Sequence, residues 1–153
     1  FENMCKAAAN DGITLISISA YRTYSYQSTL YNNRVQRCIN EGMTRAEAEK
    51  KAATIVALPG TSEHQLGLAV DIIDTSTWNL DESQENVPAQ QWLMANSWRH
   101  GFILRSPVGS TSVTGSTYEP WHYRYVGCQA AKEIYQRGIT LEEYLGITSV
   151  YAD

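Results

Sequence analysis

The segment GTSEHQLGLAVDI, residues 60–72, separates a histidine from an aspartate by seven positions with a glycine between them. If one helix spanned both residues, the Cα atoms of His64 and Asp71 would lie about 10.5 Å apart along its axis, too far to share a small ion. A turn at Gly67 brings them closer, because glycine adopts left-handed conformations freely and LAVDII, residues 68–73, has the β-branched, apolar character of a strand. The segment therefore favours a turn followed by a strand, with Asp71 returning beside His64.

Alternation along this strand places Ala69 and Asp71 on one face and the apolar Val70 and Ile72 on the other. We expect the apolar face to pack inward, while the small Ala69 leaves room for an ion next to Asp71. Two ligands do not make a catalytic zinc site, which usually has three protein ligands and a fourth position for water. A third ligand must come from elsewhere in the chain.

Two further histidines, His100 and His122, are available as that ligand. His100 belongs to RHG at the expected end of a helix, where imidazole commonly hydrogen-bonds the last carbonyl groups. His122 lies in EPWHYR, three residues after Glu119, and the proline between them prevents regular strand pairing, so both side chains can face one cleft. We therefore expect His122 to complete the metal site with His64 and Asp71.

Length, charge and hydropathy limit the classes of protein to consider. A chain of 153 residues can bury one core but not two ordinary ones, so we expect a single domain over residues 1–153. The formal net charge of −4 and the scattered Lys and Arg residues give no basis for a nucleic-acid partner. No apolar run approaches the roughly 20 residues that span a bilayer. Because the sequence begins with Phe1 and contains no signal-type segment, we expect a targeting segment upstream.

The three cysteines, Cys5, Cys38 and Cys128, are widely spaced and contain no C-x-x-C pair. An odd number does not make a complete disulfide framework. We expect three buried, reduced thiols in preference to one disulfide and a free thiol.

Helical and strand patterns are mixed along the chain without a regular βαβ period. T-x-x-E capping boxes at Thr44 and Thr140 mark two helix starts, and glycines mark several helix ends. The expected helices cover residues 1–11, 27–41, 45–58, 88–101, 128–137 and a last turn or two after 140, and the expected strands cover 13–19, 68–73, 102–106 and 118–127. The order favours an α+β fold with a small, mainly antiparallel sheet flanked by helices.

Two motifs in this chain resemble those of a known family. SEHQLGLAVD, residues 62–71, resembles the S-x-H-x-x-G-x-A-x-D signature of VanY-type D-alanyl-D-alanine carboxypeptidases, and EPWH, residues 119–122, resembles their downstream E-x-x-H element. SAYRTYSYQ, residues 19–27, is similar to the family's substrate-binding stretch, and the order of elements is similar over essentially the whole chain. The resemblance implies the hedgehog-like fold shared with zinc carboxypeptidases and endopeptidases of bacterial cell walls.

The same resemblance assigns roles to individual residues. Carried over position by position, it implies zinc ligands at His64, Asp71 and His122, the catalytic base at Glu119, and substrate contacts at Arg22, Gln27 and Ser62. The implied reaction removes the terminal D-alanine from peptidoglycan stem peptides, outside the cytoplasmic membrane of a bacterium, by a monomer. Three alternatives stay open: an L,D-carboxypeptidase acting on tetrapeptides, a cell-wall endopeptidase, and a zinc-bearing binding module without turnover.

The substrate contacts depend more on the resemblance than the metal ligands do. A carboxypeptidase must bind a free carboxylate, which a planar guanidinium does through two parallel hydrogen bonds. Arg22 is our choice, and Arg99, Arg105 and Arg124 are its competitors. Ser62 has a structural alternative, because serine before a turn commonly bonds its own backbone.

Four aromatic side chains near these motifs offer a possible wall for a peptide groove. They are Tyr21, Tyr24, Trp78 and Trp121. Aromatic residues at such positions more often belong to the core, so we expect core packing for them.

Overall fold

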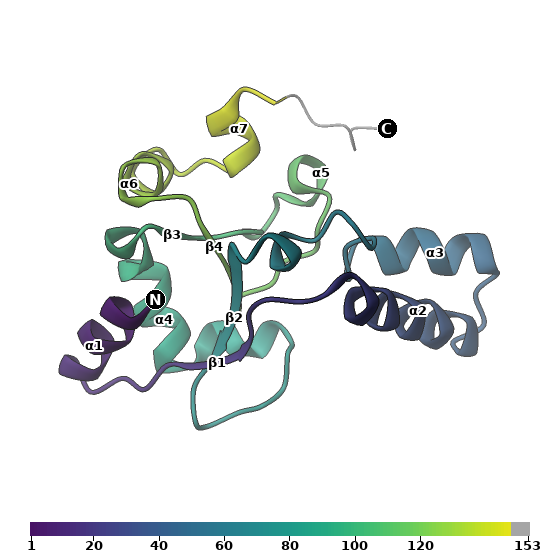
Figure 1. Cartoon of the computed structure of the whole chain (residues 1–153), viewed down its shortest axis with the longest axis horizontal. Coiled ribbons are helices and arrows are strands. Elements are labelled where there is room, and N and C mark those ends of the chain that lie inside the picture. The colour runs from purple at the N-terminus through teal and green to yellow at the C-terminus, as the bar shows by residue number, and fades with distance from the viewer. Residues whose placement is uncertain (148–153) are drawn as a thin grey trace.

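A four-stranded antiparallel sheet in the order β1-β2-β4-β3 organises the fold (Figure 1). The computed structural model describes residues 1–147. The strands are β1 (Ile16–Ser19), β2 (Ala69–Ile73), β3 (Phe102–Leu104) and β4 (His122–Tyr125). The expected α+β fold with a small antiparallel sheet is confirmed.

Seven α-helices lie within the described residues. They are α1 (Glu2–Asn10), α2 (Tyr24–Asn40), α3 (Arg45–Ala53), α4 (Pro88–Asn96), α5 (Thr111–Thr114), α6 (Cys128–Arg137) and α7 (Leu141–Leu145). Short 3₁₀ helices occupy η1 (Glu63–Leu66), η2 (Glu82–Asn86) and η3 (Ser97–His100). Both expected capping boxes form, with Thr44 and Thr140 each accepting a hydrogen bond from the backbone of a glutamate three residues on.

Several expected boundaries were wrong. The strand at 13–19 was expected to be buried, but β1 is shorter and lies at the sheet edge, where its residues stay partly exposed. Helix α2 begins three residues early at Tyr24, because Thr23 accepts a hydrogen bond from Tyr26 and caps it. Helix α3 ends at Ala53, well before residue 58.

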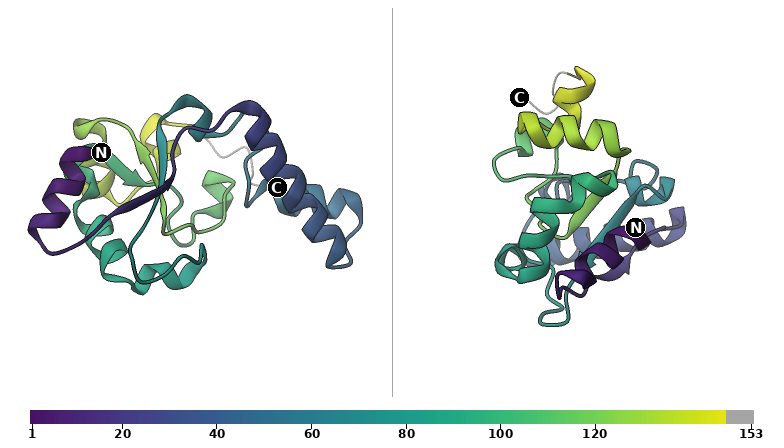
Figure 2. Two further views of the ribbon diagram at one scale, coloured as in Figure 1. Left: turned by 60° about the horizontal axis from the view of Figure 1, so that its bottom comes forward. Right: turned by 90° about the vertical axis from the view of Figure 1, so that its left-hand side faces the viewer.

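The two faces of the sheet have different environments. Helices α1 and α4 cover one face through an apolar cluster of buried side chains: Met4, Val70, Ile72, Leu93, Phe102 and Tyr123. On the other face, α6 and α7 pack over Ile103 of β3. The right-hand view of Figure 2 shows these two helix pairs on opposite sides of the sheet. Asp71 and His122 alternate with the apolar core residues, so they lie on the α6–α7 side.

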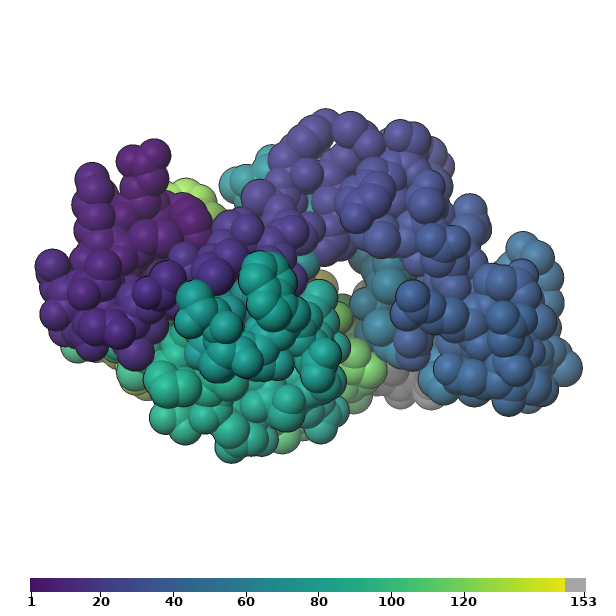
Figure 3. All heavy atoms as spheres, turned by 90° about the horizontal axis from the view of Figure 1, so that it is seen from below, coloured from purple at the N-terminus to yellow at the C-terminus, as the bar shows by residue number. Residues whose placement is uncertain are grey.

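Helices α2 and α3 form a separate pair that projects from the sheet (Figures 1 and 2). A small apolar cluster of Val35, Cys38, Ala48 and Ala52 holds the two helices together. The connection from β1 to α2, which includes Arg22, joins this pair to the sheet. In Figure 3 the molecular surface is deeply notched between the projecting pair and the rest of the molecule.

The cysteine expectation was only partly right. All three thiols are free in the described structure, but only Cys38 is buried, while Cys5 is intermediate and Cys128 is exposed. Cys128 is the first residue of α6.

The expected core packing of the aromatic residues was wrong at three positions. The exposed fractions are 67% for Tyr21, 63% for Tyr24 and 68% for Trp78, and of the four residues only Trp121 is partly buried.

Within residues 1–147, no helix has both the length and the apolar character that a bilayer crossing requires.

Candidate metal centre and active site

The η1 turn and strand β2 bring His64 and Asp71 together. Gly67 ends η1 with φ of 68°, a left-handed conformation that glycine adopts without the steric cost of a Cβ atom. The chain then enters β2, where Asp71 is paired with Ser19 of β1 on one side and with His122 of β4 on the other. The turn-and-strand arrangement expected from the sequence is confirmed.

A tight turn places Glu119 next to His122. The backbone N–H of His122 donates to the carbonyl oxygen of Glu119 at 3.1 Å, with Pro120 and Trp121 at the two central positions. Proline is favoured at the first of these positions because its φ is already set for the turn. The expected strand over 118–127 therefore begins only at His122, and Glu119 in the turn before it interacts electrostatically with His122 and Asp71.

Three candidate ligand atoms converge at this point. His64 Nε2 lies 3.4 Å from Asp71 Oδ1, and His122 Nδ1 lies 2.9 Å from the same oxygen. One ligand atom from each of the three side chains lies within 4.8 Å of the others. Ligands bound tetrahedrally to zinc at about 2.0–2.1 Å are separated by about 3.3 Å, so the two contacts with Asp71 are close to the spacing a zinc ion needs.

The backbone fixes the orientation of the His64 imidazole. Its Nδ1 lies 2.7 Å from the carbonyl oxygen of Ala20, and a carbonyl oxygen only accepts, so Nδ1 carries the hydrogen. His64 Nε2 then presents a lone pair toward Asp71. A hydrogen bond from the N–H of Arg22 to the carbonyl of His64, at 3.1 Å, ties the β1–α2 connection to the same turn.

Arg22 lies in the site, but its partner is a candidate metal ligand. Its Nη2 donates to Asp71 Oδ2 at 2.5 Å, its Nε to Ser19 Oγ at 2.8 Å, and its Nη1 to Gln27 Oε1 at 3.4 Å. Three of the five N–H groups of the guanidinium are therefore engaged, and two stay available to a ligand. Asp71 consequently faces the two imidazoles with one oxygen and Arg22 with the other.

Gln27 and Ser62 are both buried beside this arrangement. Gln27 is 0% exposed and donates to the carbonyl of Ala57 at 2.8 Å, while its side-chain oxygen accepts from Arg22. Ser62 is 5% exposed and precedes η1 without a side-chain capping hydrogen bond. The structure therefore gives Gln27 a contact with Arg22 and gives Ser62 no backbone capping role.

The charges in the site depend on one another. Burial raises the pKa of Asp71, but hydrogen bonds and charge interactions with His122 and His64 outweigh it and hold that pKa well below its usual range. Burial lowers the pKa of His122, but Asp71 and the nearby Glu63 outweigh it and raise the pKa to about 9. The ionised Asp71 therefore stabilises positive charge on the imidazole of His122 beside it.

Glu119 behaves differently from the other carboxylates. Its burial raises the pKa to about 7, with His122 opposing and Asp71 supporting the rise. A carboxyl group with a pKa close to neutrality can both accept and release a proton, as general acid–base catalysis requires. The structure thus distinguishes Glu119 from Asp71, which stays ionised.

His100 and Arg99 lie outside this arrangement, whereas Arg105 and Arg124 contact its edge through Glu63. His100 stacks on Trp92 with ring centroids 6.3 Å apart, and Arg99 lies over the ring of Trp98. His100 therefore lies apart from the group formed by His64, Asp71 and His122. Arg105 and Arg124 both bind Glu63, at 2.8 Å and 2.7 Å.

Glu63 is a residue of the site that the sequence did not single out. One of its oxygens binds the two arginines, and the other lies 3.7 Å from His122 Nε2. Its position directly before His64 was the signal available in the sequence, but nothing there showed the distant partners.

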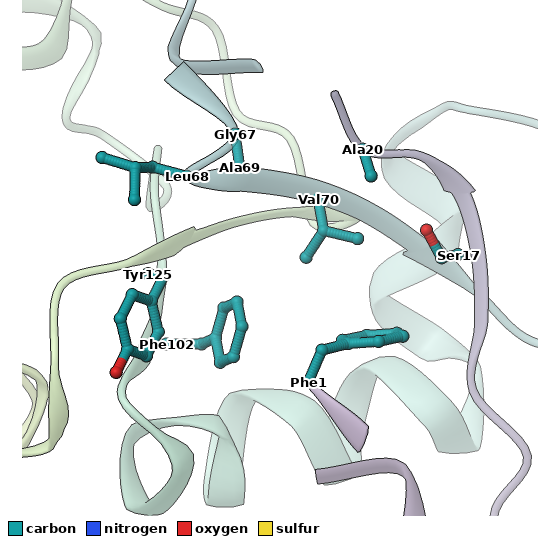
Figure 4. A pocket seen from close by; sticks show the side chains of 9 residues that line it. All are labelled: Phe1, Ser17, Ala20, Gly67, Leu68, Ala69, Val70, Phe102 and Tyr125. Atoms are coloured by element: carbon teal, nitrogen blue, oxygen red, sulfur yellow. The ribbon is translucent and has the colours of Figure 1, made fainter. Parts of the chain in front are cut away.

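A separate pocket of about 340 Å³ lies over the other side of β2 (Figure 4). Its lining includes the apolar or aromatic side chains of Phe1, Val70, Phe102 and Tyr125. The hydroxyl groups of Ser17 and Tyr125 are the side-chain polar groups in this lining, and no candidate ligand or base belongs to it. The pocket therefore offers no chemistry comparable to that of the His–Asp–His cluster.

The fold and the cluster together define an α+β protein with a candidate metal-ligand set on one face of its sheet, next to a carboxyl group of raised pKa. Residues 1–128 match the family model described as VanY, D-alanyl-D-alanine carboxypeptidase. The chain is also 47% identical over 146 residues to a D-alanyl-D-alanine carboxypeptidase of Enterococcus faecalis, covering 94% of this chain and 52% of that protein. The chain belongs to the VanY family of D-alanyl-D-alanine carboxypeptidases, and it spans about half the length of this relative.

Solved structures are similar over nearly the whole chain. VanYB in complex with D-alanine-D-alanine has a TM-score of 0.87 at 45% identity, covering 95% of this chain and 77% of that one. A mutant of the vancomycin resistance D,D-pentapeptidase VanY in complex with Zn(II) has a TM-score of 0.84 at 45% identity, covering 94% and 78%. The LdcB LD-carboxypeptidase has a TM-score of 0.82 at 38% identity, covering 97% and 65%. These likenesses confirm the expected hedgehog-like peptidase fold.

Proposed function

We propose that this chain is a zinc-dependent D,D-carboxypeptidase that removes the terminal D-alanine from peptidoglycan stem peptides. The observation that carries the proposal is the convergence of His64 Nε2, Asp71 Oδ1 and His122 Nδ1 beside a glutamate of raised pKa. Family membership supports it, as do the relatives bound to Zn(II) and to D-alanine-D-alanine.

The donor set fits zinc. Two imidazoles and one carboxylate are common ligands of catalytic zinc, and three protein ligands leave a position for water or substrate. Zinc bound by His64, Asp71 and His122 would polarise the scissile carbonyl group and lower the pKa of water. The bond from Arg22 to the second oxygen of Asp71 would hold that carboxylate to one ligand oxygen.

Glu119 is the proposed catalytic base. Its carboxylate would accept a proton from the attacking water and then release it to the departing amine nitrogen of D-alanine. The turn from Glu119 to His122 fixes the spacing between the base and one ligand, which is the positioning that proton transfer requires.

Arg22, Gln27 and Ser62 are the proposed substrate contacts. Arg22 has two N–H groups left for the terminal carboxylate of the stem peptide, and Gln27 holds one side of its guanidinium. The buried Ser62 hydroxyl precedes the metal-ligand turn, where it could contact the peptide.

We expect Arg22→Ala to reduce kcat/KM on a stem peptide with a free terminal carboxylate by about 10- to 100-fold, since hydrogen bonds between charged groups contribute about 1.5–3 kcal/mol. Arg22→Lys should fall between the native protein and Arg22→Ala, because it keeps the charge but loses the planar fork. The comparison substrate is the same peptide with an amidated C-terminus. Amidation should impair the native protein strongly and Arg22→Ala much less. Equal loss on both peptides would mean that Arg22 acts through Asp71 alone.

The structural likeness to LdcB supports a second candidate, an L,D-carboxypeptidase that cleaves tetrapeptide stems. Purified protein should be incubated with defined tri-, tetra- and pentapeptide stems, with the released amino acid measured by mass. Release of D-alanine from pentapeptide alone supports the D,D reaction, and release from tetrapeptide supports the L,D reaction. Cleavage well inside the peptide would make the chain an endopeptidase, and binding without cleavage would make it a binding module.

The setting of this activity is also part of the proposal. Peptidoglycan stem peptides lie outside the cytoplasmic membrane, so we place the protein in the bacterial cell envelope, exported or anchored there. We also propose that residues 1–153 act as one catalytic domain and as a monomer. In support of one domain, side chains from Arg22 to Glu142 belong to the site or contact it.

A further inference from the structure

The two carboxylate oxygens of Glu63 have different partners. Oε1 accepts from Arg105 Nε at 2.8 Å and lies 2.7 Å from Arg124 Nη1. Oε2 is buried and has no hydrogen-bond partner among the described residues, and it lies 3.7 Å from His122 Nε2. An ion pair that served only to join segments of the chain would be expected to engage both oxygens, because a buried acceptor without a partner is unfavourable.

Arg105 continues this arrangement toward the C-terminal helix. Its Nη1 donates to Glu142 Oε2 at 3.1 Å, and its Nη2 donates to the other oxygen of Glu142. Glu142 belongs to α7, beyond the residues that match the family model. Opposite charges therefore alternate from α7 to the candidate metal centre, through Glu142, Arg105, Glu63 and His122.

Burial strengthens the charge interactions among these four side chains. The side chains of Glu142, Arg105, Glu63 and His122 are only 12% to 19% exposed. Ion pairs shielded from water are screened less by salt than surface pairs are. The paired charges also come from η1, β4, α7 and the residue after β3, so η1 is fixed to three other parts of the fold.

Glu63 faces the ring nitrogen of His122 that a zinc ion would leave free. Without metal, both nitrogens face carboxylates, with Nδ1 2.9 Å from Asp71 and Nε2 3.7 Å from Glu63. Zinc bound through the Nδ1 lone pair would require the hydrogen on Nε2, where the Glu63 carboxylate can accept it. The Ala20 carbonyl does the equivalent for His64, whose Nδ1 carries the hydrogen and whose Nε2 is free. Acceptors behind metal-bound imidazoles commonly fix the tautomer and the ring orientation.

We propose that Glu63 is a positioning residue for His122, and that α7 holds Glu63 in place through Glu142 and Arg105. The inference rests on the proposed metal-binding function, because it gives His122 Nδ1 the role of a zinc ligand. It assigns the C-terminal helix a part in the metal centre although α7 itself supplies no ligand.

The test compares Glu63→Ala with Glu63→Gln by zinc affinity, measured by competition with a chelator of known affinity. We expect Glu63→Ala to bind zinc 10- to 100-fold more weakly, the usual effect of removing such an acceptor. Glu63→Gln should be at least as harmful. Its amide oxygen would take the place of Oε1 between the two arginines, so its NH₂ group would face His122 Nε2 and favour the hydrogen on Nδ1. A purely structural role predicts the opposite order, with Gln milder than Ala because Gln preserves shape and one acceptor.

Two further measurements separate positioning from general damage. ¹⁵N NMR of the zinc-loaded protein should show the hydrogen on His122 Nε2, and the His64 signals should be the same in the native protein and in Glu63→Gln. Glu142→Gln should weaken zinc binding by a few fold in the same direction. Glu49→Gln is the matched control, because it removes a carboxylate from the exposed ion pair with Arg45 and should leave zinc affinity unchanged.

Unchanged zinc affinity in both Glu63 variants would overturn the proposal, and so would equal shifts of the His64 and His122 signals, which would show that η1 itself had moved. A native protein that binds no zinc would instead defeat the proposed function. In that case crystal structures of the metal-free native protein and Glu63→Ala still decide the positioning role. A rotated His122 ring with an unmoved His64 ring supports it, and two unchanged rings contradict it.

Discussion

His122→Ala should bind zinc far more weakly than the native protein and lose essentially all hydrolysis of stem peptides. The variant removes one of the three proposed ligands, the imidazole whose Nδ1 lies 2.9 Å from Asp71 Oδ1 in the native protein. The loss should exceed the 10- to 100-fold effect typical of removing a group that only supports a ligand. Metal content after dialysis and D-alanine release from a pentapeptide are the two measurements.

His100→Ala is the matched control for this prediction. His100 is the last residue of η3 and stacks on Trp92, away from the cluster, so its removal should leave zinc content and turnover unchanged. In the native protein, a chelator should abolish activity and added zinc should restore it. Full activity after thorough metal removal, or in His122→Ala, would rule out the metal hypothesis. Loss of zinc in His100→Ala would show that the third ligand had been chosen wrongly.

The local part of the site could be predicted from the sequence. Gly67 between His64 and LAVDII indicated a turn and a strand, and the alternation of side chains gave the face of Asp71. The structure has both features, with Gly67 in the left-handed conformation and Asp71 in β2. These predictions succeeded because they depend on backbone preferences within about ten residues.

The sequence could not give the contacts that join distant strands. The pairing of Asp71 with His122 depends on the register of β2 and β4, which are about 50 residues apart, and only packing of the assembled sheet sets that register. The bond from Arg22 to Asp71 and the pairing of Glu63 with Arg105 are of the same kind. Sequence motifs placed Arg22 near the site but did not show that a proposed ligand is its direct partner.

The expected boundaries of two helices were wrong because the sequence signals for their start or end were weak. Helix α3 was expected to continue through TIVAL, but those residues are β-branched in part and the helix ends at Ala53. Helix α2 starts early because Thr23 caps it, a signal that the polar, aromatic character of the segment obscured. The exposed tyrosines near this start were expected in the core because aromatic side chains are usually buried, a preference that a surface turn does not follow.

The second large effect concerns Glu119. We expect Glu119→Gln to keep its fold and its zinc but to lose turnover by about 10²-fold or more, because an amide cannot accept a proton from the attacking water. Glu119→Asp should retain part of the rate, since it keeps a carboxylate but withdraws it by one methylene group. Glu133→Gln, which changes a glutamate of α6 hydrogen-bonded to Gln129, is the control and should match the native protein.

The separation of rate from binding makes this prediction specific to proton transfer. Glu119 is not one of the three side chains of the His–Asp–His cluster, so zinc affinity should stay within a few fold of the native value in Glu119→Gln. Binding of the stem peptide, measured by calorimetry on the inactive variant, should also survive, because Arg22 and Gln27 keep their contacts with each other. A near-normal rate in Glu119→Gln would mean that another group accepts the proton. Loss of zinc together with the rate would instead make Glu119 part of the metal site, since a base that only transfers protons can be removed without releasing the metal.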